Sequence, residues 1–476
     1  MRWRDRTVWV VLPAVVVAVA AVSALGPIRD VDSYWHVLLG REMWHAHRVH
    51  DLGLAWTYGP VRDNWSTTMW LSEIGMAGLE HTFGWAGLTV ARFVLLMALA
   101  VLLGRELLSD GGQRDEAARG AVFAAVLLAA AADAADRPAL ASFLFLTVLA
   151  GRLHRMRTLS VAPGLLSVGV FTAVWANIHG YWVLVPVCFV LAGVSAAADV
   201  PGGIRFRAGA ARVYAVRAAV ALVAGCVTPV GPALLLSPFR VQAATATISE
   251  WQRTSIRGFS GLVLMMVVAG CALAWAVSVQ RPGLGEPLFV LALFGFGVLA
   301  FRNATPALLL MAPVVASRAA EAFPGRERPA AGPGIRALAA ALMIGSVAGA
   351  AGVLLSQDPL RGVLPRASLA VLAGEPGERR VLNDYNVGGK IVAFSGPRVR
   401  VAVDGRADLY GGPWLAEYKR MQAGQPGWDE TLARLAPTDA VLRTDQALAG
   451  LLRGRGWTVT ADDGLWVLLL APSPQQ

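Results

Sequence analysis

Apolar stretches of bilayer length recur between residues 8 and 355, and they limit what this chain can fold into. About 20 apolar residues span a bilayer as a helix, and only helices and closed barrels satisfy their own backbone hydrogen bonds there. Hydrophobic residues make up 56% of the 476 residues and charged residues 16%. This composition is typical of an integral membrane protein, and the length of the stretches indicates the helical type.

A window of bilayer length predicts eleven spans. The first is interpreted as an uncleaved span, because no strong Ala-x-Ala cleavage site follows it. The three cysteines fall inside predicted spans, where they pack as small hydrophobes and offer neither a disulfide framework nor a cysteine metal site. The predicted spans are 8–26, 85–103, 120–135, 138–150, 161–175, 181–198, 218–236, 262–279, 287–301, 306–320 and 337–355.

Arginines concentrate in alternate loops, which fixes a predicted orientation. Arg105, Arg152, Arg205, Arg281 and Arg318 all fall in loops that are cytoplasmic if the N-terminus is cytoplasmic, as the positive-inside rule requires. The net charge of +10 therefore reads as a topology signal, and we expect no nucleic-acid partner. The odd number of spans leaves the long loop 27–84 and everything after residue 355 outside a plasma membrane.

In the tail from residue 356 to residue 476 the long apolar stretches give way to shorter ones. Short apolar runs at 380–383, 399–403, 440–442 and 465–470 alternate with amphipathic stretches at 414–423 and 445–453. This alternation predicts a small α/β domain with a partly parallel sheet. The predicted fold class is thus a polytopic α-helical membrane protein, with a transmembrane module at 1–355 that includes the loop 27–84 and an extracytoplasmic α/β domain at 356–476.

Asp30 and Asp32 lie just past the first predicted span, where carboxylates are costly. One interpretation is that they bind a divalent cation, Mg²⁺ or Mn²⁺, or that one of them takes a proton from an incoming hydroxyl. The other is that they cap a surface helix that begins near Ser33. Both acids are candidate catalytic and metal-binding residues, and His36 in the same run is a candidate substrate-binding residue.

The short outward segments also carry polar groups. Asp133, Asp136 and Arg137 sit between two alanine-rich spans, either as an ion pair that holds a helical hairpin or as the lining of a wet cavity. All three are candidate substrate-binding residues.

Two further outward segments add to this set. Asn177 and His179 end one span, and a histidine there is either a hydrogen-bonded structural group or a base. Arg302 ends another span, where it either snorkels to the interface or binds a lipid-linked phosphate.

Two motifs in the tail follow predicted strands. Asp384 and Tyr385 come after the first strand, and Asp404 and Arg406 come after the next one. Polar residues at the carboxyl ends of adjacent parallel strands are where open α/β sheets place ligand sites. The alternative is turn chemistry, because Gly-Gly and Asp-Gly suit turns.

Together these motifs resemble the GT-C superfamily of membrane glycosyltransferases, in which an acidic motif follows the first span, membrane-parallel helices occupy the first outer loop and a second acidic motif often follows the third span. Asp30 and Asp32 match the first motif, and Asp133 and Asp136 stand where the second would be. The segment at 383–389 is similar to the Trp-Trp-Asp-Tyr-Gly element of the oligosaccharyltransferase catalytic subunit, but it lacks both tryptophans. A group of bacterial membrane proteins shares the tryptophan-rich stretch at 63–73 and the Asn-x-His-Gly and Asp-Gly-Arg motifs.

The resemblance implies an inverting transfer of a hexosyl or pentosyl group from a polyprenyl-phosphate-linked donor in the membrane to a glycan, lipid or protein acceptor. It assigns the base or metal role to Asp30 or Asp32 and stabilisation of the departing phosphate to Arg302 and Arg137. Two alternatives remain open: a transporter or flippase of a lipid-linked solute, and a non-catalytic envelope-assembly protein.

The arginine asymmetry makes a prediction about topology. A reporter enzyme that works only outside the cytoplasm should be active when fused after Leu355 and inactive when fused in the loop beside His154. Whole-cell activity of the two fusions measures this. An inactive fusion after Leu355 at normal expression would contradict the predicted orientation.

Overall fold

The computed structural model describes residues 4–63, 65–108, 116–201, 204–237, 249–323 and 333–472. The chain divides into two compact units. Unit 1 comprises Met1–Gly26, Thr89–Gly231 and Glu250–Gln357, and unit 2 comprises Pro27–Leu88, Pro232–Ser249 and Asp358–Gln476, in each case for the described residues.

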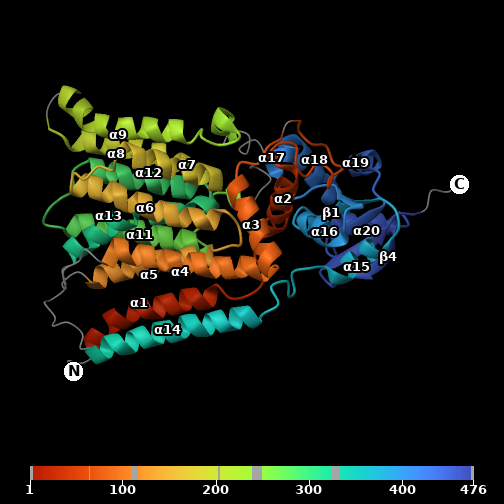
Figure 1. The fold of residues 1–476 in the computed structure, drawn as a ribbon, viewed down its shortest axis with the longest axis horizontal. Coiled ribbons are helices and arrows are strands. Elements are labelled where there is room, and N and C mark those ends of the chain that lie inside the picture. Colours follow the sequence, from red (N-terminus) through yellow and green to blue (C-terminus); the bar gives the residue numbers. More distant parts are fainter. Residues whose placement is uncertain are drawn as a thin grey trace. The chain divides into compact units, whose positions relative to one another are not determined.

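Unit 1 is a helical bundle (Figure 1). Within the described residues a helix is found at each of the eleven predicted spans, and five stretches are long and apolar enough to cross a membrane: 86–108, 139–158, 180–199, 259–277 and 339–356. A multi-pass membrane protein is thereby confirmed. The helices are α1 (Arg4–Ser23), α4 (Ala86–Leu108), α5 (Glu116–Ala132), α6 (Ala139–Thr158), α7 (Leu165–Ile178), α8 (Leu184–Asp199), α9 (Ile204–Ala224), α11 (Phe259–Val277), α12 (Gly285–Leu299), α13 (Ala304–Ala322) and α14 (Pro333–Ser356), with 3-10 turns η1 (Gly180–Val183), η4 (Ser249–Trp251) and η5 (Phe301–Asn303). A further 3-10 turn, η2 (Gly231–Leu236), begins at the last residue of the second segment of unit 1 and otherwise belongs to unit 2.

One predicted span is displaced. The apolar window placed it at 218–236, whereas α9 runs over Ile204–Ala224 and a 3-10 turn follows at Gly231–Leu236. Arginine is a good helix former, so the basic segment that looked like a loop is helical. Gly225 directly follows the helix and Pro229 comes four residues later, and both residue types disfavour helix interiors.

Helix α13 forms the centre of unit 1. Every residue from Ala304 to Ala316 is buried, and the helix contacts α5, α6, α11 and α12. A helix that is apolar on all sides is stable only where neighbours surround it.

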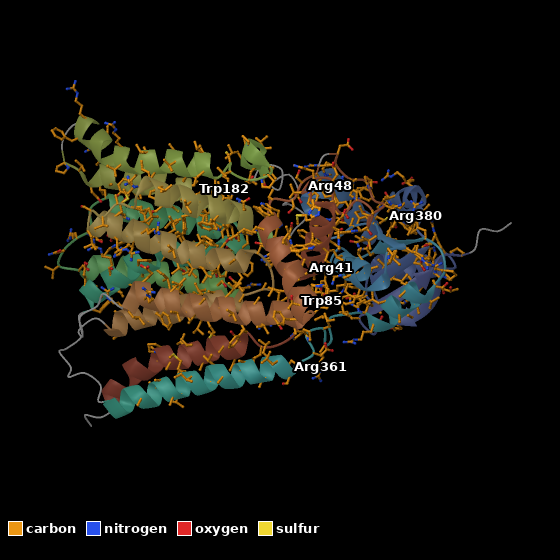
Figure 2. All side chains as sticks on the ribbon, in the orientation of Figure 1. Arg41, Arg48, Trp85, Trp182, Arg361 and Arg380 are labelled. Atoms are coloured by element: carbon orange, nitrogen blue, oxygen red, sulfur yellow. The ribbon has the colours of Figure 1, made fainter. Side chains whose placement is uncertain are left out.

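Gly225, just after α9, allows close packing at the end of that helix. A Cβ at Gly225 would lie 2.0 Å from the Trp182 ring, which is labelled in Figure 2. Glycine at that position therefore lets the indole pack on the end of α9.

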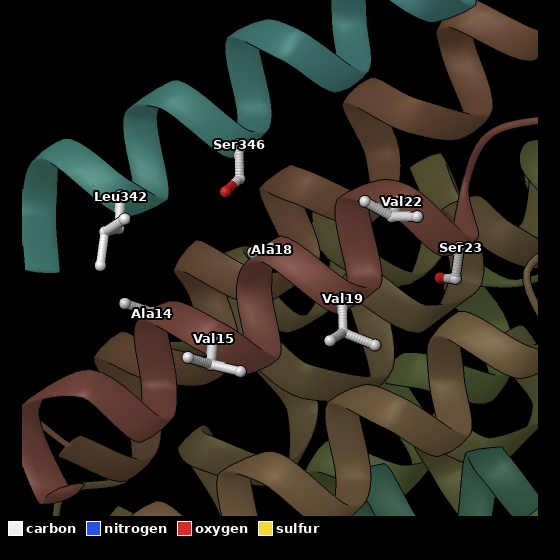
Figure 3. Close-up of a pocket in the computed structure, with 8 residues that line it drawn as sticks. All are labelled: Ala14, Val15, Ala18, Val19, Val22, Ser23, Leu342 and Ser346. Carbon is white, nitrogen blue, oxygen red and sulfur yellow. The ribbon is translucent and has the colours of Figure 1, made fainter.

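A groove of about 440 Å³ lies between α1 and α14 (Figure 3). Apart from Ser23 and Ser346, alanine, valine and leucine side chains line it. A sugar or phosphate site needs convergent polar groups, which this lining does not offer. The groove is therefore not a candidate active site.

Unit 2 contains a five-stranded sheet of order β2-β1-β3-β5-β4. Strand β1 is parallel to β2 and β3, and β5 is antiparallel to β3 and β4, so the predicted partly parallel α/β domain is confirmed. Strand β4 was missed, because its exposed edge residues carry no apolar run. The elements are α2 (Ser33–Ala46), α3 (Trp70–Phe83), α15 (Arg366–Gly374), β1 (Arg379–Asn383), α16 (Gly388–Ser395), β2 (Val399–Val401), α17 (Ala407–Tyr410), α18 (Gly412–Gln422), α19 (Trp428–Leu435), β3 (Asp439–Arg443), α20 (Ala447–Gly454), β4 (Thr458–Asp462) and β5 (Trp466–Leu470).

The loop after the first span packs with the tail. The sequence predicts that residues 27–84 belong to the transmembrane module, but in the structure they share a hydrophobic core with the tail. Leu52 and Trp65 are buried in this core against tail residues such as Leu409. Backbone hydrogen bonds from Tyr58 N to Val401 O (3.1 Å) and from Val401 N to Trp56 O (2.8 Å) place the loop beside β2.

This shared core predicts that shortening Leu52 destabilises the tail. Leu52 is fully buried, so Leu52→Ala should lower the free energy of unfolding of unit 2 by about 2–5 kcal/mol. Protease resistance of the tail during heating of the purified protein measures it. Val61→Ala, at a valine of the same loop that is 37% exposed, is the control and should change little. Equal behaviour of the two variants would contradict the shared core.

Candidate functional site

The two carboxylates after the first span are arranged by local hydrogen bonds. Asp30 Oδ1 accepts from the Asp32 backbone N–H at 2.8 Å, and Asp32 Oδ1 accepts from Trp35 Nε1 at 2.9 Å. Asp32 occupies the N-cap position of α2, yet its side chain makes no capping hydrogen bond to the described backbone of that helix. Both acids are partly exposed. The indole thus orients the Asp32 carboxylate in a way that simple helix capping does not require.

Glycines in the tail allow its backbone to approach this carboxylate. A Cβ at Gly405 would lie 1.9 Å from Asp32 Oδ1 and 2.4 Å from Trp35 Nε1. Gly389, near the start of α16, has the Trp35 backbone nitrogen 3.4 Å from the position of its missing Cβ. Side chains at these positions would collide with α2 or crowd it. The Asp-Gly-Arg and Gly-Gly motifs therefore bring the tail against the start of α2.

Tyr385 supports the same contact. Its hydroxyl donates to Gly405 O at 2.8 Å. Burial raises the pKa of Tyr385 well above its ordinary value, and the carboxylates of Asp32 and Asp404 raise it further. The phenol therefore stays neutral and adds no negative charge beside Asp32.

Asp404 and Arg406 form a buried ion pair. Arg406 Nη2 lies 2.6 Å from Asp404 Oδ2 and Nε lies 2.9 Å from Oδ1, and both side chains are at most 1% exposed. Burial would lower the pKa of Arg406, but the Asp404 carboxylate outweighs it and the pKa is raised. Two further guanidinium N–H groups donate to Leu52 O (3.3 Å) and Gly53 O (3.0 Å). The pair therefore fastens the first loop to the tail.

Aromatic rings complete this arrangement. The Arg406 guanidinium stacks over the rings of Trp56 and Trp65, at 4.9 and 5.4 Å from their centroids. Trp65 Nε1 donates to Asp408 Oδ2 at 3.0 Å. Sequence reasoning did not single out these tryptophans as partners of the Asp-Gly-Arg motif, although their clustering in the first loop was visible.

Asp384 directly follows β1 and is buried. Its Oδ1 accepts from the Asn386 backbone N–H at 2.8 Å, and its Oδ2 accepts from Gln446 Nε2 at 3.3 Å. The neighbouring Asn383 is fully buried and donates from Nδ2 to Val403 O at 2.8 Å. These hydrogen bonds join the end of β1 to the segment after β2 and to the start of α20. They agree with the interpretation of this motif as a turn.

In unit 1, Asp136 pairs with an arginine that sequence analysis passed over. Arg92 Nη1 lies 2.6 Å from Asp136 Oδ2, and both side chains are fully buried. Arg92 also donates to Ala24 O and Gly26 O, at 2.8 Å each. Because Arg92 lies within a long apolar run, its role was not evident from composition. It ties the ends of α1 and α4 to the segment after α5.

Asp133 and Arg137 make separate contacts in the same segment. Asp133 accepts from Ser260 Oγ at 2.8 Å and from Thr305 Oγ1 at 2.6 Å, which links the end of α5 to α11 and α13. Arg137 Nη1 pairs with Glu250 Oε1 at 2.5 Å. Asp133, Asp136 and Arg137 therefore each bind a different set of partners.

His179 is buried at the end of α7. Its Nδ1 lies 3.0 Å from Ser142 Oγ and accepts from the Tyr181 backbone N–H at 3.3 Å, so the proton of the neutral ring belongs on Nε2. Nearby, Asn177 Nδ2 donates to Ala173 O (2.7 Å) and Val227 O (2.9 Å).

Arg302 is held between two aromatic rings. Its guanidinium lies 4.7 Å from the Trp251 ring centroid and 5.6 Å from that of Tyr181. The Tyr181 hydroxyl donates to Arg302 O at 2.9 Å. Arg302 Nε also donates to the Tyr181 hydroxyl at 3.4 Å, so Tyr181 holds the guanidinium through both its ring and its hydroxyl.

The described residues contain no group of three or more His, Cys, Asp or Glu side chains able to hold a metal ion. Mg²⁺ or Mn²⁺ prefers six ligands, of which Asp30 and Asp32 would supply two carboxylates, with water or substrate phosphate supplying the rest. The donor chemistry of the two carboxylates suits such an ion.

Comparison with solved structures identifies the architecture. No protein-family model matches the sequence, and no curated protein matches it. The structure superposes on apo ArnT from Cupriavidus metallidurans with a TM-score of 0.51 and 16% identity, over 98% of this chain and 99% of that one. ArnT is a GT-C glycosyltransferase. The chain has a GT-C fold.

A second GT-C-type structure matches as well. AftD, an arabinofuranosyltransferase from Mycobacteria, gives a TM-score of 0.50 at 13% identity, over 98% of this chain and 42% of that one. This chain therefore spans less than half the length of AftD. The GT-C resemblance read from the acidic motifs is confirmed at the level of the fold.

The buried pair predicts a stability effect. Asp404→Asn leaves the Arg406 charge without its partner, so it should destabilise unit 2 by about 3–5 kcal/mol. Asp445→Asn is the matched control, because it breaks an exposed pair with Arg443 and should cost at most about 1 kcal/mol. Thermal unfolding followed by tryptophan fluorescence distinguishes them. A stable Asp404→Asn protein would show that the pair does not hold the loop to the tail.

Proposed function

We propose that this protein is a membrane glycosyltransferase that uses a polyprenyl-phosphate-linked sugar as donor at the outer face of the membrane. The fold it shares with ArnT and AftD supports a glycosyltransferase. The observation that carries the proposal is the Asp32 carboxylate, which follows the first span and is oriented by Trp35 Nε1 with Gly405 at close approach.

In the proposed reaction Asp32 is the base. Its carboxylate takes the proton of an acceptor hydroxyl while the hydroxyl oxygen bonds to the anomeric carbon of the sugar. The bond from that carbon to the phosphate oxygen breaks, and the polyprenyl phosphate leaves with the electron pair. A single displacement of this kind inverts the anomeric configuration. The transferred group is a hexosyl or pentosyl unit, and the acceptor is a glycan, lipid or protein.

Asp30 and the tail have positioning roles in this proposal. Asp30 holds the backbone of Asp32, and Tyr385 holds the Gly405 carbonyl. The buried pair of Asp404 and Arg406 keeps that segment in place through the first loop. Asp384 and His36 are also proposed as substrate-binding residues; His36 is buried, and its Nδ1 lies 3.0 Å from Glu73 Oε1.

Arg302 is proposed to bind the donor phosphate. It carries a charge stacked on Trp251 and Tyr181, and arginine binds phosphate oxygens through two parallel N–H groups. Arg137 has the same proposed role but shares its charge with Glu250. Asp133, Asp136, Asn177 and His179 are proposed to shape the acceptor or donor site through the contacts described above.

The proposal predicts that Asp32→Asn keeps the shape of the site and loses its base. Turnover of a polyprenyl-phosphate-linked hexose or pentose by the purified protein should fall on the order of a hundredfold or more. Asp63→Asn, at an exposed aspartate of the same loop, should leave turnover unchanged. Both proteins should melt like the wild type.

Three results would count against it. Near-normal turnover of folded Asp32→Asn would leave Asp32 as a structural residue. Movement of an intact donor across proteoliposomes without consumption would favour a flippase. Neither consumption nor movement with any donor tested would favour an assembly protein.

A further inference from the structure

A charged cavity of about 340 Å³ lies at the other end of unit 1. It is formed where α6, α8 and α13 end and α12 begins, whereas Asp133, His179 and Arg302 lie at the opposite ends of helices in the same bundle. The lining includes His154, Arg157 and Ser317. None of these residues enters the proposed transfer reaction.

Arg157 is the residue of the cavity lining that is suited to bind a hydrogen-bond acceptor. Its guanidinium lies over the Phe289 ring, 4.9 Å from the centroid, and Nη1 is enclosed with no hydrogen-bond acceptor among the described atoms. An enclosed N–H group that lacks an acceptor is costly, so a ligand that supplies one is favoured.

Three carboxylates line the cavity, those of Asp199, Glu286 and Glu321, and Arg318 Nη1 donates to Glu321 Oε2 at 2.6 Å. Glu286 accepts from Arg318 Nε at 2.6 Å and Nη2 at 2.9 Å, and Asp199 Oδ1 accepts from the Gly285 backbone N–H at 2.7 Å. Both acids act electrostatically on Arg157, but their hydrogen bonds go elsewhere. Arg318 is therefore internally paired, and Arg157 is the cation able to bind an anion.

A histidine and a serine lie in the cavity lining together with Arg157. His154 Nε2 lies 3.2 Å from Ser317 Oγ, which places an imidazole and a hydroxyl in the lining beside the guanidinium. The site lies at the ends of bilayer-length helices, the level at which lipid headgroups lie, and Leu159 just past α6 is 63% exposed. Arginine at such a level commonly binds phosphate.

We propose that this cavity binds a phosphate group through Arg157, with His154 and Ser317 as further hydrogen-bonding partners. The phosphate belongs either to a membrane lipid or to a soluble molecule. The site is separate from the proposed transfer reaction, and its test uses binding alone.

The experiment is native mass spectrometry of the delipidated full-length protein in detergent. Three probes are used: dioleoyl phosphatidic acid, inorganic phosphate, and dioleoylglycerol, which has the same chains without phosphate. The wild type should bind a phosphate-bearing probe and not dioleoylglycerol. Arg157→Gln should weaken that binding at least about tenfold, the effect of losing a charged hydrogen bond.

Arg152→Gln is the matched control. Arg152 lies on the same helix with the same charge, but it bonds Ser167 Oγ at 3.1 Å and does not line the cavity, so its variant should bind like the wild type. If Arg157→Gln does not fold, Arg157→Lys replaces it; it keeps the charge but loses the planar fork, and should bind more weakly than the wild type.

Phosphatidic acid binding alone would identify a lipid site, and inorganic phosphate binding alone a soluble phosphate site. Binding of dioleoylglycerol as tight as that of phosphatidic acid, or an equal loss in the Arg152 and Arg157 variants, would overturn the proposal. So would absence of binding by both phosphate-bearing probes.

Discussion

The buried charge of Arg406 is the interaction on which unit 2 depends. A guanidinium that is fully removed from water is tolerable only when every N–H group finds an acceptor and a carboxylate balances the charge. Asp404 supplies the charge, and the carbonyls of Leu52 and Gly53 supply two further acceptors. A residue of the tail thereby requires the first loop for its own stability, and the two segments fold as one unit.

The same ion pair also positions the backbone beside Asp32, the proposed catalytic residue. Gly405 lies between Asp404 and Arg406 in sequence, so the ion pair on either side fixes the backbone that approaches Asp32. Tyr385 then holds the Gly405 carbonyl from the end of β1. The Asp-Gly-Arg motif therefore has one structural role that also serves the proposed site. Its two charged side chains stay buried as an ion pair, and its glycine lies against Asp32.

Features with a local signal could be predicted from the sequence. The helices of unit 1 follow from the length of apolar runs, and the strands around Val381 and Val401 follow from short apolar stretches between turns. The start of α9 was missed because arginines in a helix look like a loop. The Arg92–Asp136 pair and the Arg406–Gly53 contact join residues that are far apart in sequence, and no periodicity records such pairing. For the same reason the sequence identified Asp32 as a candidate but not the indole of Trp35 that orients it.

The anomeric configuration of the product tests the central claim most directly. If Asp32 acts as the base in a single displacement, NMR of the product should show an anomeric configuration opposite to that of the polyprenyl-phosphate-linked donor. Retention of configuration would require a covalent sugar intermediate, and it would contradict the mechanism proposed for Asp32.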